Sequence, residues 1–295
     1  MIAGSNGVVQ PETPRTVLDF LRRATVFLAQ HEVATPRLDA EVLLAFLLDA
    51  KRVDVYLRFD QPLGEAEVVA YRELVRRRGA GEPVAYLTGR REFWSRDVQV
   101  TPDVLIPRPE TELLVERALA DIGDRTRALR VLDLGTGSGA LALALATELP
   151  GAQVVALDVS PAAVAVARGN IESAGLADRV EVAISDWTAS IDGGPCFDLI
   201  VCNPPYVETA VLGTLAAEVR QEPALALDGG PDGLVAYRAL VPLAMPLLAS
   251  GGRMLLEIGE GQAEPVAALL GAAGSREVAR YRDLAGIERV VGGYA

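Results

Sequence analysis

The chain has 295 residues, of which 50% are hydrophobic and 23% are charged. This composition supports a core large enough for two domains and excludes a disordered chain, and two cysteines make no disulfide framework. No apolar run is long enough to span a bilayer, and the N-terminal segment has neither the basic start nor the apolar stretch of a signal peptide. We therefore expect a cytoplasmic protein without membrane segments.

Charge and histidine content narrow the classes of function. The net charge is −12, and residues 106–295 carry 25 acidic against 14 basic side chains. Nucleic-acid binding relies on cationic groups, so we expect no direct contact with nucleic acid. His31 is the single histidine, which leaves multi-histidine zinc sites without ligands and argues against Ser-His-Asp hydrolysis. The sequence predicts no metal site.

The first part of the chain has helical periodicity. Apolar residues recur on one stripe between Thr16 and Gln30, a second helix opens at Pro36 with Thr35 as its N-cap, and a third spans Gly64 to Arg78. We predict a small helical bundle over residues 12–85.

A β-hairpin linker is predicted over residues 86–106. Short strands at 92–94 and 98–100 flank the polar turn Ser95–Asp97. Prolines at 102, 107 and 109 then mark a connector (residues 101–109) that leads to a helix starting near Glu110.

From residue 107 to 295 we predict one α/β domain, because short apolar strands alternate with helices, as in a parallel sheet covered on both faces. The predicted strands are Arg130–Leu134, Gln153–Asp158, Val180–Ile184, Phe197–Cys202 and Arg253–Ile258. The predicted helices are Gly139–Glu148, Pro161–Ala174, Leu234–Leu248 and Gln262–Leu270. Two final strands, Glu277–Arg282 and Glu288–Val291, are separated by too few residues for a crossover helix and should pair antiparallel.

The first of these strands runs into the glycine loop (residues 133–140), which reads Asp133-Leu-Gly135-Thr136-Gly137-Ser138-Gly139-Ala140. Glycines allow close approach of the backbone to a ligand and a direct turn into a helix. The spacing also fits a dinucleotide-binding fingerprint, and Asp158 can hold a ribose in either case. Asp133 favours S-adenosylmethionine, because we expect its carboxylate to face the ligand, where it attracts a sulfonium and an ammonium and repels a pyrophosphate.

The fourth strand ends in the acceptor loop (residues 203–206), Asn203-Pro204-Pro205-Tyr206. The two prolines remove backbone N–H donors, so the loop offers mainly carbonyl oxygens. We expect the Asn203 side-chain oxygen and the Pro204 carbonyl to accept the two hydrogens of a planar NH2 group, with the Tyr206 ring over its face. Holding both hydrogens out of the amide plane would localise the nitrogen lone pair and aim it at a methyl group, and such positioning needs no strong general base.

Together these two loops resemble the class I S-adenosylmethionine-dependent amino-group methyltransferases. More narrowly, the chain resembles the peptide chain release factor glutamine methyltransferase family (PrmC/HemK). The narrower likeness rests on further segments: Arg37-Leu-Asp-Ala-Glu41, Pro83-Val-Ala-Tyr-Leu-Thr-Gly89, Leu105-Ile-Pro-Arg-Pro-Glu-Thr-Glu112, Glu218-Val-Arg220, Ala226-Leu-Asp-Gly-Gly230 and Leu256-Glu-Ile-Gly259 with Gly261-Gln262.

The resemblance implies a Rossmann-like domain with a mostly parallel seven-stranded sheet and an antiparallel C-terminal strand. It also implies transfer of a methyl group to the side-chain amide nitrogen of the glutamine in the Gly-Gly-Gln motif of class 1 release factors, with the helical bundle recognising that partner. We expect a monomer.

The same resemblance assigns the site residues. The cofactor-binding residues would be Asp133, Gly135, Thr136, Gly137, Ser138, Gly139, Asp158, Asp186, Trp187 and Asn203. Asn203, Pro204, Pro205 and Tyr206 would hold the substrate glutamine, and Asn203, Pro204 and Tyr206 would act in catalysis. The roles of Phe93, Trp94, Arg108 and Glu110 stay open between packing and a part in the site, and Cys202 is given no chemistry.

Three other classes of protein fit parts of the pattern. A nucleic-acid amino methyltransferase would use the same acceptor loop for a base NH2 group. A nicotinamide-dependent oxidoreductase fits the glycine loop, but that class of enzyme gives the acceptor loop no function. A non-catalytic binding module would need neither Asp133, Asp158 nor Asn203.

Overall fold

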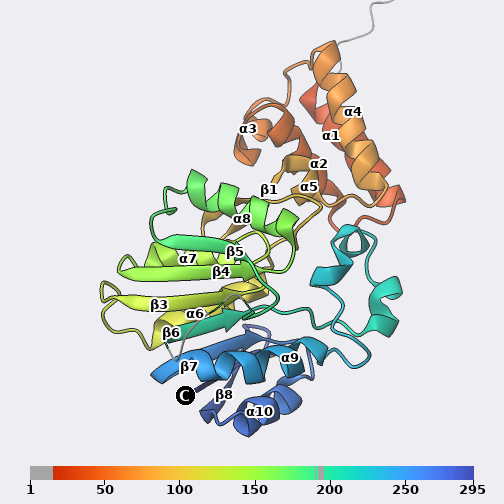
Figure 1. Ribbon diagram of the computed structural model, residues 1–295. Helices are drawn as coiled ribbons and strands as arrows, with labels where there is room; N and C mark the ends of the chain where they lie inside the picture. The colour runs from red at the N-terminus through yellow and green to blue at the C-terminus, as the bar shows by residue number, and fades with distance from the viewer. Residues whose placement is uncertain (1–15, 190, 192–195) are drawn as a thin grey trace, which may run out of the picture. The chain divides into compact units, whose positions relative to one another are not determined.

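The computed structural model describes residues 16–189, 191 and 196–295 (Figure 1). The chain divides into two compact units, with the boundary between Thr88 and Gly89. Within the described residues, no helix combines the length and the apolar character needed to cross a bilayer.

The first unit consists of short helices around one apolar core. They are α1 (Val17–Gln30), α2 (Pro36–Leu47), α3 (Arg52–Leu57), α4 (Glu65–Gly79) and α5 (Val84–Thr88). The three predicted helices are confirmed as α1, α2 and α4, whereas the short α3 and α5 were not predicted. Thr35 occupies the N-cap position of α2 but makes no capping hydrogen bond; its hydroxyl donates to Asp39 Oδ1 at 2.7 Å instead.

Buried charges explain the segment Arg37–Glu41 in this unit. Arg78 Nε donates to Asp39 Oδ2 at 2.6 Å, and both side chains are almost fully buried. Glu41 accepts hydrogen bonds from Arg37 and Tyr56. Removing one partner of such a pair leaves an uncompensated buried charge, so these residues fix how α2 and α4 pack.

The hairpin consists of β1 (Arg90–Phe93) and β2 (Arg96–Gln99). The predicted turn at Ser95–Asp97 is wrong, because the connection is the two-residue turn Trp94-Ser95, whose φ angles are +50° and +57°. Positive φ at both central residues is the turn geometry that matches the twist of a hairpin. Trp94 donates its backbone N–H to Glu112 at 2.8 Å and its ring N–H to Glu148 at 3.0 Å. The hairpin therefore packs on the second unit, to which it belongs.

The second unit is built on one seven-stranded sheet in the order β5-β4-β3-β6-β7-β9-β8. The strands are β3 (Leu129–Leu134), β4 (Ala152–Asp158), β5 (Val180–Ile184), β6 (Phe197–Cys202), β7 (Leu248–Glu257), β8 (Arg276–Arg282) and β9 (Glu288–Tyr294). Only β9 runs against its neighbours, β7 and β8. The predicted fold class is confirmed. The strand β7 begins five residues earlier than predicted, because the preceding α-helix ends at Ala244 and a single 3-10 turn, Met245–Leu247, leads directly into the strand.

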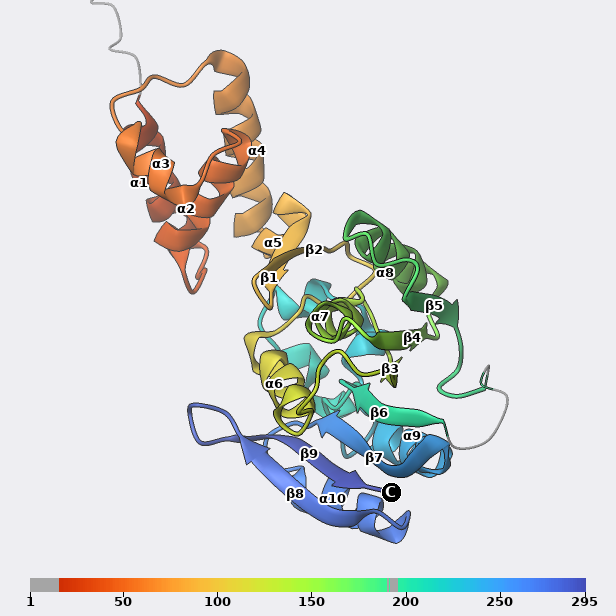
Figure 2. The same cartoon turned by 90° about the vertical axis from the view of Figure 1, so that its left-hand side faces the viewer.

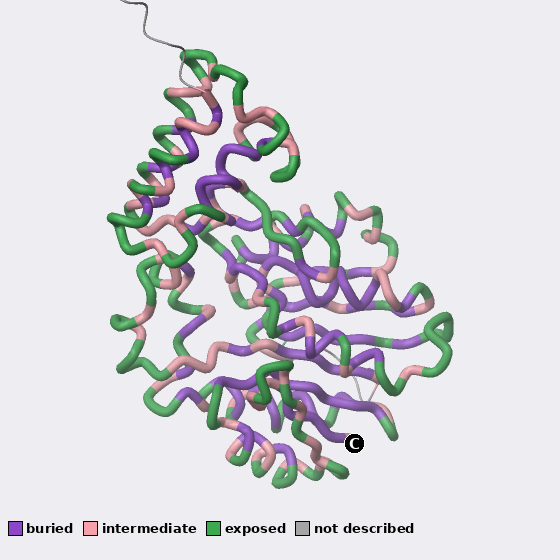
Figure 3. The backbone as a smooth tube through the Cα atoms, turned by 180° about the vertical axis from the view of Figure 1, so that it is seen from behind, coloured by how far each residue is buried: buried purple, intermediate pink, exposed green. Residues whose placement is uncertain are grey.

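Helices cover both faces of this sheet (Figure 1 and Figure 2). One core contains α6 (Glu112–Ala120), α7 (Ala140–Glu148) and α8 (Pro161–Ser173) with the hairpin residues Phe93 and Val98. The other core contains α9 (Val235–Ala244) and α10 (Ala263–Ala272). The central strands are therefore buried on both sides, as the purple segments in Figure 3 show. Because both faces are covered, the edge formed by the strand ends is where ligands can bind.

Candidate active site

Strand register brings the predicted site segments to one place. β3 pairs in parallel with β4 on one side and with β6 on the other, and Leu134 is its last paired residue. Gly135, Asp158 and Asn203 therefore lie side by side at the carboxyl edge of the sheet. The order of the strands along the chain reverses between β3 and β6, and such a switch point is where open α/β sheets bind ligands.

The glycine loop turns sharply into α7. Gly135, Gly137 and Gly139 have φ values of +68°, +56° and +80°, which glycine adopts without the penalty that a Cβ brings. A Cβ at Gly139 would lie 3.2 Å from the Cβ of Ala167, so this third glycine allows α7 and α8 to pack closely. The first two glycines face open space or the Trp187 ring.

Asp133 lies beneath the glycine loop rather than at its surface. Its Oδ2 accepts from the Thr136 hydroxyl at 2.6 Å and from the Ala142 N–H at 3.2 Å. Full burial, and secondarily the charge of Asp158, raise the pKa of this carboxyl to about 7. The expectation that its carboxylate faces the ligand is wrong, because the side chain is fully buried beneath the loop. Its contacts show that it shapes the loop from within.

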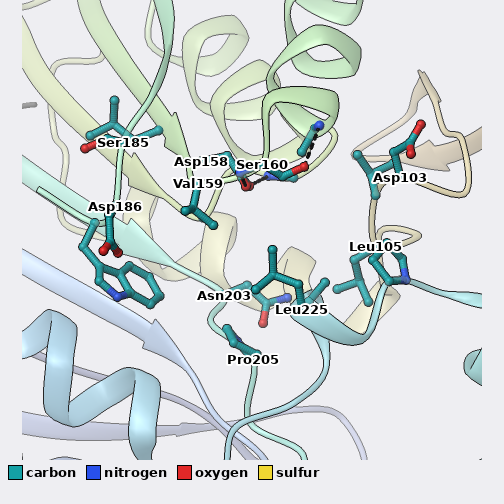
Figure 4. Close-up of a pocket in the computed structure, with 18 residues that line it drawn as sticks. Asp103, Leu105, Asp158, Val159, Ser160, Ser185, Asp186, Asn203, Pro205 and Leu225 are labelled. Carbon is teal, nitrogen blue, oxygen red and sulfur yellow. Dashed lines mark hydrogen bonds between the residues drawn. The ribbon is translucent and has the colours of Figure 1, made fainter. Parts of the chain in front are cut away.

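A cavity of about 300 Å³ lies in front of the strand ends (Figure 4). Of the predicted residues it is lined by Gly135, Gly137, Asp158, Asp186, Trp187, Asn203 and Pro205. Thr136, Ser138, Gly139, Pro204 and Tyr206 do not line it, so any contact of theirs with a ligand stays a prediction. Further lining residues, not predicted, include Asp103, Leu105, Ser185, Pro223 and Leu225.

Asp158 presents a carboxylate at the wall of the cavity. Its Oδ2 accepts from the Gly137 N–H at 2.8 Å and its Oδ1 from the Ser160 N–H at 2.9 Å. Each oxygen keeps a free lone pair for a hydroxyl group of a ligand. The N-cap of α8 is Ser160, whose hydroxyl accepts from the Ala163 N–H at 3.2 Å. Asp158 is therefore not needed as the N-cap of α8.

The turn after β5 brings Asp186 and Trp187 into the lining of the cavity, and Asp186 lies across it from Asp103 and Leu105 (Figure 4). Trp187 has a positive φ of +50°, which is uncommon for a bulky residue and tends to occur at functional turns. These groups fit S-adenosylmethionine: the carboxylates of Asp158 and Asp186 can accept from hydroxyl and amino groups, the indole can lie against an adenine, and glycine backbone lies at the floor. No described side chain with a positive charge lines this cavity, as suits a ligand bearing a sulfonium.

The acceptor loop forms the lower rim of the cavity (Figure 4). Asn203 donates through Nδ2 to the Thr111 hydroxyl at 3.2 Å, which leaves its side-chain oxygen available. The Tyr206 hydroxyl donates to Glu257 Oε1 at 3.3 Å, and the Tyr206 carbonyl accepts from Gln262 Nε2 at 3.0 Å. The loop is therefore anchored from three distant segments, and the predicted cover of a substrate amide by the Tyr206 ring stays a prediction.

Glycine is required where the chain passes behind this loop. A Cβ at Gly229 would lie 2.7 Å from the Tyr206 Cα, closer than real Cβ atoms come. The Val207 N–H and carbonyl also pair with backbone at Leu227 and Gly229. The segment Ala226–Gly230 thus serves to hold the acceptor loop.

The connector is tied across the cavity by Glu222, a residue that sequence reasoning missed. This buried carboxylate accepts from the Ile106 N–H at 3.0 Å and from Arg108 Nη2 at 2.5 Å. It joins the segment with Leu105 to the segment with Leu225, which both line the cavity. This contact gives Arg108 a structural role. Phe93 is buried in the core and Trp94 packs against it, and neither lines the cavity.

Comparisons with known proteins agree with this architecture. The chain matches the family model of the PrmC N-terminal domain over residues 19–89 and that of a methyltransferase small domain over residues 109–240. Among solved structures, the T. thermophilus 16S rRNA N2 G1207 methyltransferase is similar with a TM-score of 0.51 and 24% identity, covering 70% of this chain and 49% of that one. This last likeness concerns the fold.

Two relatives are similar over almost the whole chain. The release factor glutamine methyltransferase of Moorella thermoacetica is 45% identical over 280 residues, covering 95% of each protein. That of Geobacter sulfurreducens is 46% identical over 282 residues, covering 95% of this chain and 96% of the relative. With both units matched at this level, the chain belongs to the release factor glutamine methyltransferase family.

Proposed function

We propose that this chain transfers a methyl group from S-adenosylmethionine to the side-chain amide nitrogen of the glutamine in the Gly-Gly-Gln motif of class 1 peptide chain release factors. The proposal is supported by the whole-length similarity to relatives named for this activity. The observation that carries it in the structure is the register of β3 and β6, which sets an acceptor loop directly beside a glycine loop at one cavity.

The cavity residues bind and orient the cofactor. S-Adenosylmethionine supplies a methyl group on a sulfonium sulfur. Asp158 accepts hydrogen bonds from the ribose hydroxyls, while Asp186 and Trp187 contact the adenine part. Gly135 and Gly137 keep the floor free of side chains. The carboxylates also favour a cationic ligand electrostatically.

The acceptor loop binds the substrate carboxamide. Asn203 Oδ1 and the Pro204 carbonyl each accept one N–H and hold the two hydrogens out of the amide plane, which opposes delocalisation of the nitrogen lone pair into the carbonyl. A new N–C bond forms as the S–C bond breaks, and the nitrogen then loses a proton to solvent. The rate gain comes from orientation, which can supply up to about 7–11 kcal/mol of a barrier.

The helical unit, predicted over residues 12–85, is proposed to recognise the release factor. A groove of about 310 Å³ between α1 and α4 supports this role. Phe20 and Phe27 give it an apolar floor, and Arg23 and Arg72 add positive charge. A mixed surface of this kind is typical of protein-binding sites. We further propose that the enzyme acts as a monomer in the cytoplasm, without binding nucleic acid directly.

A labelling experiment tests the proposed function. The chain is incubated with methyl-labelled S-adenosylmethionine and a purified class 1 release factor, the same factor with Gln→Ala in its Gly-Gly-Gln motif, ribosomal RNA or DNA. Label should enter only the unmodified release factor. Label in RNA or DNA would favour a nucleic-acid amino methyltransferase, and equal labelling of the Gln→Ala factor would place the modification elsewhere.

A further inference from the structure

Gln262 lies in a segment that the sequence singled out, Leu256–Gly259 with Gly261 and Gln262, but it has no part in the cavity. It stands at the N-cap position of α10, and its side chain makes no capping hydrogen bond. It is half-buried and does not line the cavity. Its hydrogen bonds lead instead to the acceptor loop.

The Gln262 carboxamide is held in one orientation by backbone groups. Its Nε2 donates to the Tyr206 carbonyl at 3.0 Å and to the Gly233 carbonyl at 3.3 Å. Its Oε1 accepts from the Gly259 N–H at 2.9 Å. A carbonyl only accepts and a backbone N–H only donates, so these partners fix which end of the side-chain amide is the donor.

Two glycines make room for this carboxamide. A Cβ at Gly233 would lie 2.4 Å from Gln262 Nε2 and 2.4 Å from the Tyr206 carbonyl oxygen. A Cβ at Gly259 would lie 3.0 Å from Gln262 Oε1 and 3.1 Å from Tyr206 Cδ2. The distances at Gly233 are shorter than real Cβ contacts, so glycine at this position lets Gln262 reach Tyr206.

The contact with Gln262 fixes one peptide plane. The peptide unit between Tyr206 and Val207 is planar, so its C=O and its N–H turn together. Gln262 holds the C=O, and the Val207 N–H donates to the Leu227 carbonyl at 2.9 Å. Because both polar groups are held, this plane cannot turn without breaking a hydrogen bond.

The carbonyls just before this plane are left for a ligand. In the part of the chain that the structure describes, the carbonyls of Pro204 and Pro205 accept no hydrogen bond. The ring of Pro205 fixes its φ at about −65°, which removes one of the torsions between the Pro204 carbonyl and the fixed plane. A shift at Tyr206 is therefore passed on to the Pro204 carbonyl.

We propose that Gln262 is a positioning residue for the substrate: by fixing the Tyr206–Val207 peptide, it directs the Pro204 carbonyl toward the NH2 group of the substrate amide. This inference rests on the proposed function, which assigns that carbonyl to the substrate. Gln262 does not line the cavity, so it acts through the acceptor loop.

Substitutions at Gln262 separate positioning from cofactor binding. Gln262→Glu keeps the size of the side chain, but it loses both donors and sets a carboxylate against two carbonyl oxygens. We expect kcat with a Gly-Gly-Gln peptide to fall about 100-fold, as a misplacement of about 1 Å can cause. Gln262→Met removes the same donors without adding charge and should lower kcat about tenfold. The Kd for S-adenosylhomocysteine should stay unchanged in both variants.

A matched control has the same substitution elsewhere. Gln153→Glu places the carboxylate at an exposed position on β4 and should keep full kcat. The proposal is overturned if Gln262→Met keeps full kcat, if Gln153→Glu loses as much kcat as Gln262→Glu, or if kcat and S-adenosylhomocysteine affinity fall in parallel.

Two glycine variants test the contact without changing Gln262. The φ angles are +71° at Gly233 and +69° at Gly175, so alanine strains the backbone equally at both. Only at Gly233 does the new Cβ meet Gln262 and Tyr206, whereas Gly175 is exposed and has open space around it. Gly233→Ala should therefore lower kcat about tenfold, and Gly175→Ala should keep it. Equal losses in the two variants would contradict the proposal.

A double variant shows whether both changes act through one contact. If they do, adding Gly233→Ala to Gln262→Met should lower kcat little further, because coupled substitutions are not additive. Fully additive losses would overturn the proposal.

A crystal structure of Gln262→Met gives a readout that needs no turnover. It should show the Tyr206 carbonyl turned from its wild-type direction and the Pro204 carbonyl displaced by about 1 Å. An unmoved Pro204 carbonyl would contradict the inference even if release factor labelling succeeds. A displaced loop together with failed labelling by the wild type would instead reject the proposed function alone.

Discussion

The glycine loop and the acceptor loop lie side by side but are held in different ways. The glycine loop is fixed locally, by the Thr136 hydroxyl on Asp133 three residues away and by the Gly137 N–H on Asp158, 21 residues away. The acceptor loop is fixed from afar, through Thr111, which is 92 residues from Asn203, and through Glu257 and Gln262, 51 and 56 residues from Tyr206.

The difference separates two kinds of task. Glycine-loop backbone and the carboxylate of the neighbouring strand β4 preform one wall of the cofactor cavity. Orientation of a substrate side chain depends on several elements meeting correctly. Substitutions in the first region should therefore change cofactor affinity, and substitutions in the second should change turnover.

The largest effect is expected at Asn203. Asn203→Ala removes the side-chain acceptor at the cavity and should lower kcat about 100- to 1,000-fold, with the Kd for S-adenosylmethionine nearly unchanged. Calorimetric binding and steady-state kinetics on one preparation check this. Lost cofactor binding with normal turnover would show that Asn203 serves the cofactor rather than the substrate.

Asp158 should behave in the opposite way. Asp158→Ala removes a carboxylate from the cavity wall and should weaken S-adenosylmethionine about 10- to 100-fold, as loss of a charged hydrogen-bonding group does. The kcat at saturating cofactor should change little. An unaltered Kd would argue against the ribose role.

Gly137 tests the backbone contribution. Gly137→Ala strains a φ of +56° and places a methyl group at the cavity, so cofactor affinity should fall about tenfold. Gly175→Ala is the matched control, because φ there is +69°, the residue is exposed and it lies outside the cavity. Both should lose similar stability. Equal loss of affinity in the two variants would refute a local effect.

A smaller effect is expected from the tie across the cavity. Glu222→Gln keeps an acceptor for the Ile106 N–H but weakens the pairing with Arg108, so cofactor affinity should fall about fivefold. Glu264→Gln serves as control, because it breaks an exposed ion pair between Glu264 on α10 and Arg280 on β8. If cofactor affinity fell as much in Glu264→Gln as in Glu222→Gln, the link that Glu222 makes between the two cavity segments would not explain the effect.

Asp133 predicts a pH dependence of stability. Its pKa is raised from 3.8 to about 7 by burial, so between these pH values the folded state binds more protons than the unfolded state. Stability should therefore fall as pH rises through this window. Urea unfolding of Asp133→Asn should show a shallower decline, and an identical pH dependence would contradict a buried, neutralised Asp133.

The same comparison explains how far sequence reasoning reached. Strands, helices and both loops were predictable because their signals are local, such as glycine spacing and apolar periodicity. The orientation of Asp133 was predicted wrongly, because burial beneath the loop depends on α7 packing against the strand. Glu222 and Glu257 were missed as functional residues, because their partners lie in distant segments. The Trp94-Ser95 turn was misplaced since it lacks the Asn-Gly pair that usually marks such turns.

The most direct test of the central claim is a crystal structure with S-adenosylhomocysteine and a Gly-Gly-Gln peptide. The account predicts the peptide carboxamide beside the cofactor sulfur, with its NH2 group donating to Asn203 Oδ1 and the Pro204 carbonyl. A carboxamide bound away from the sulfur, or an Asn203 that offers its NH2 group to the peptide, would contradict it.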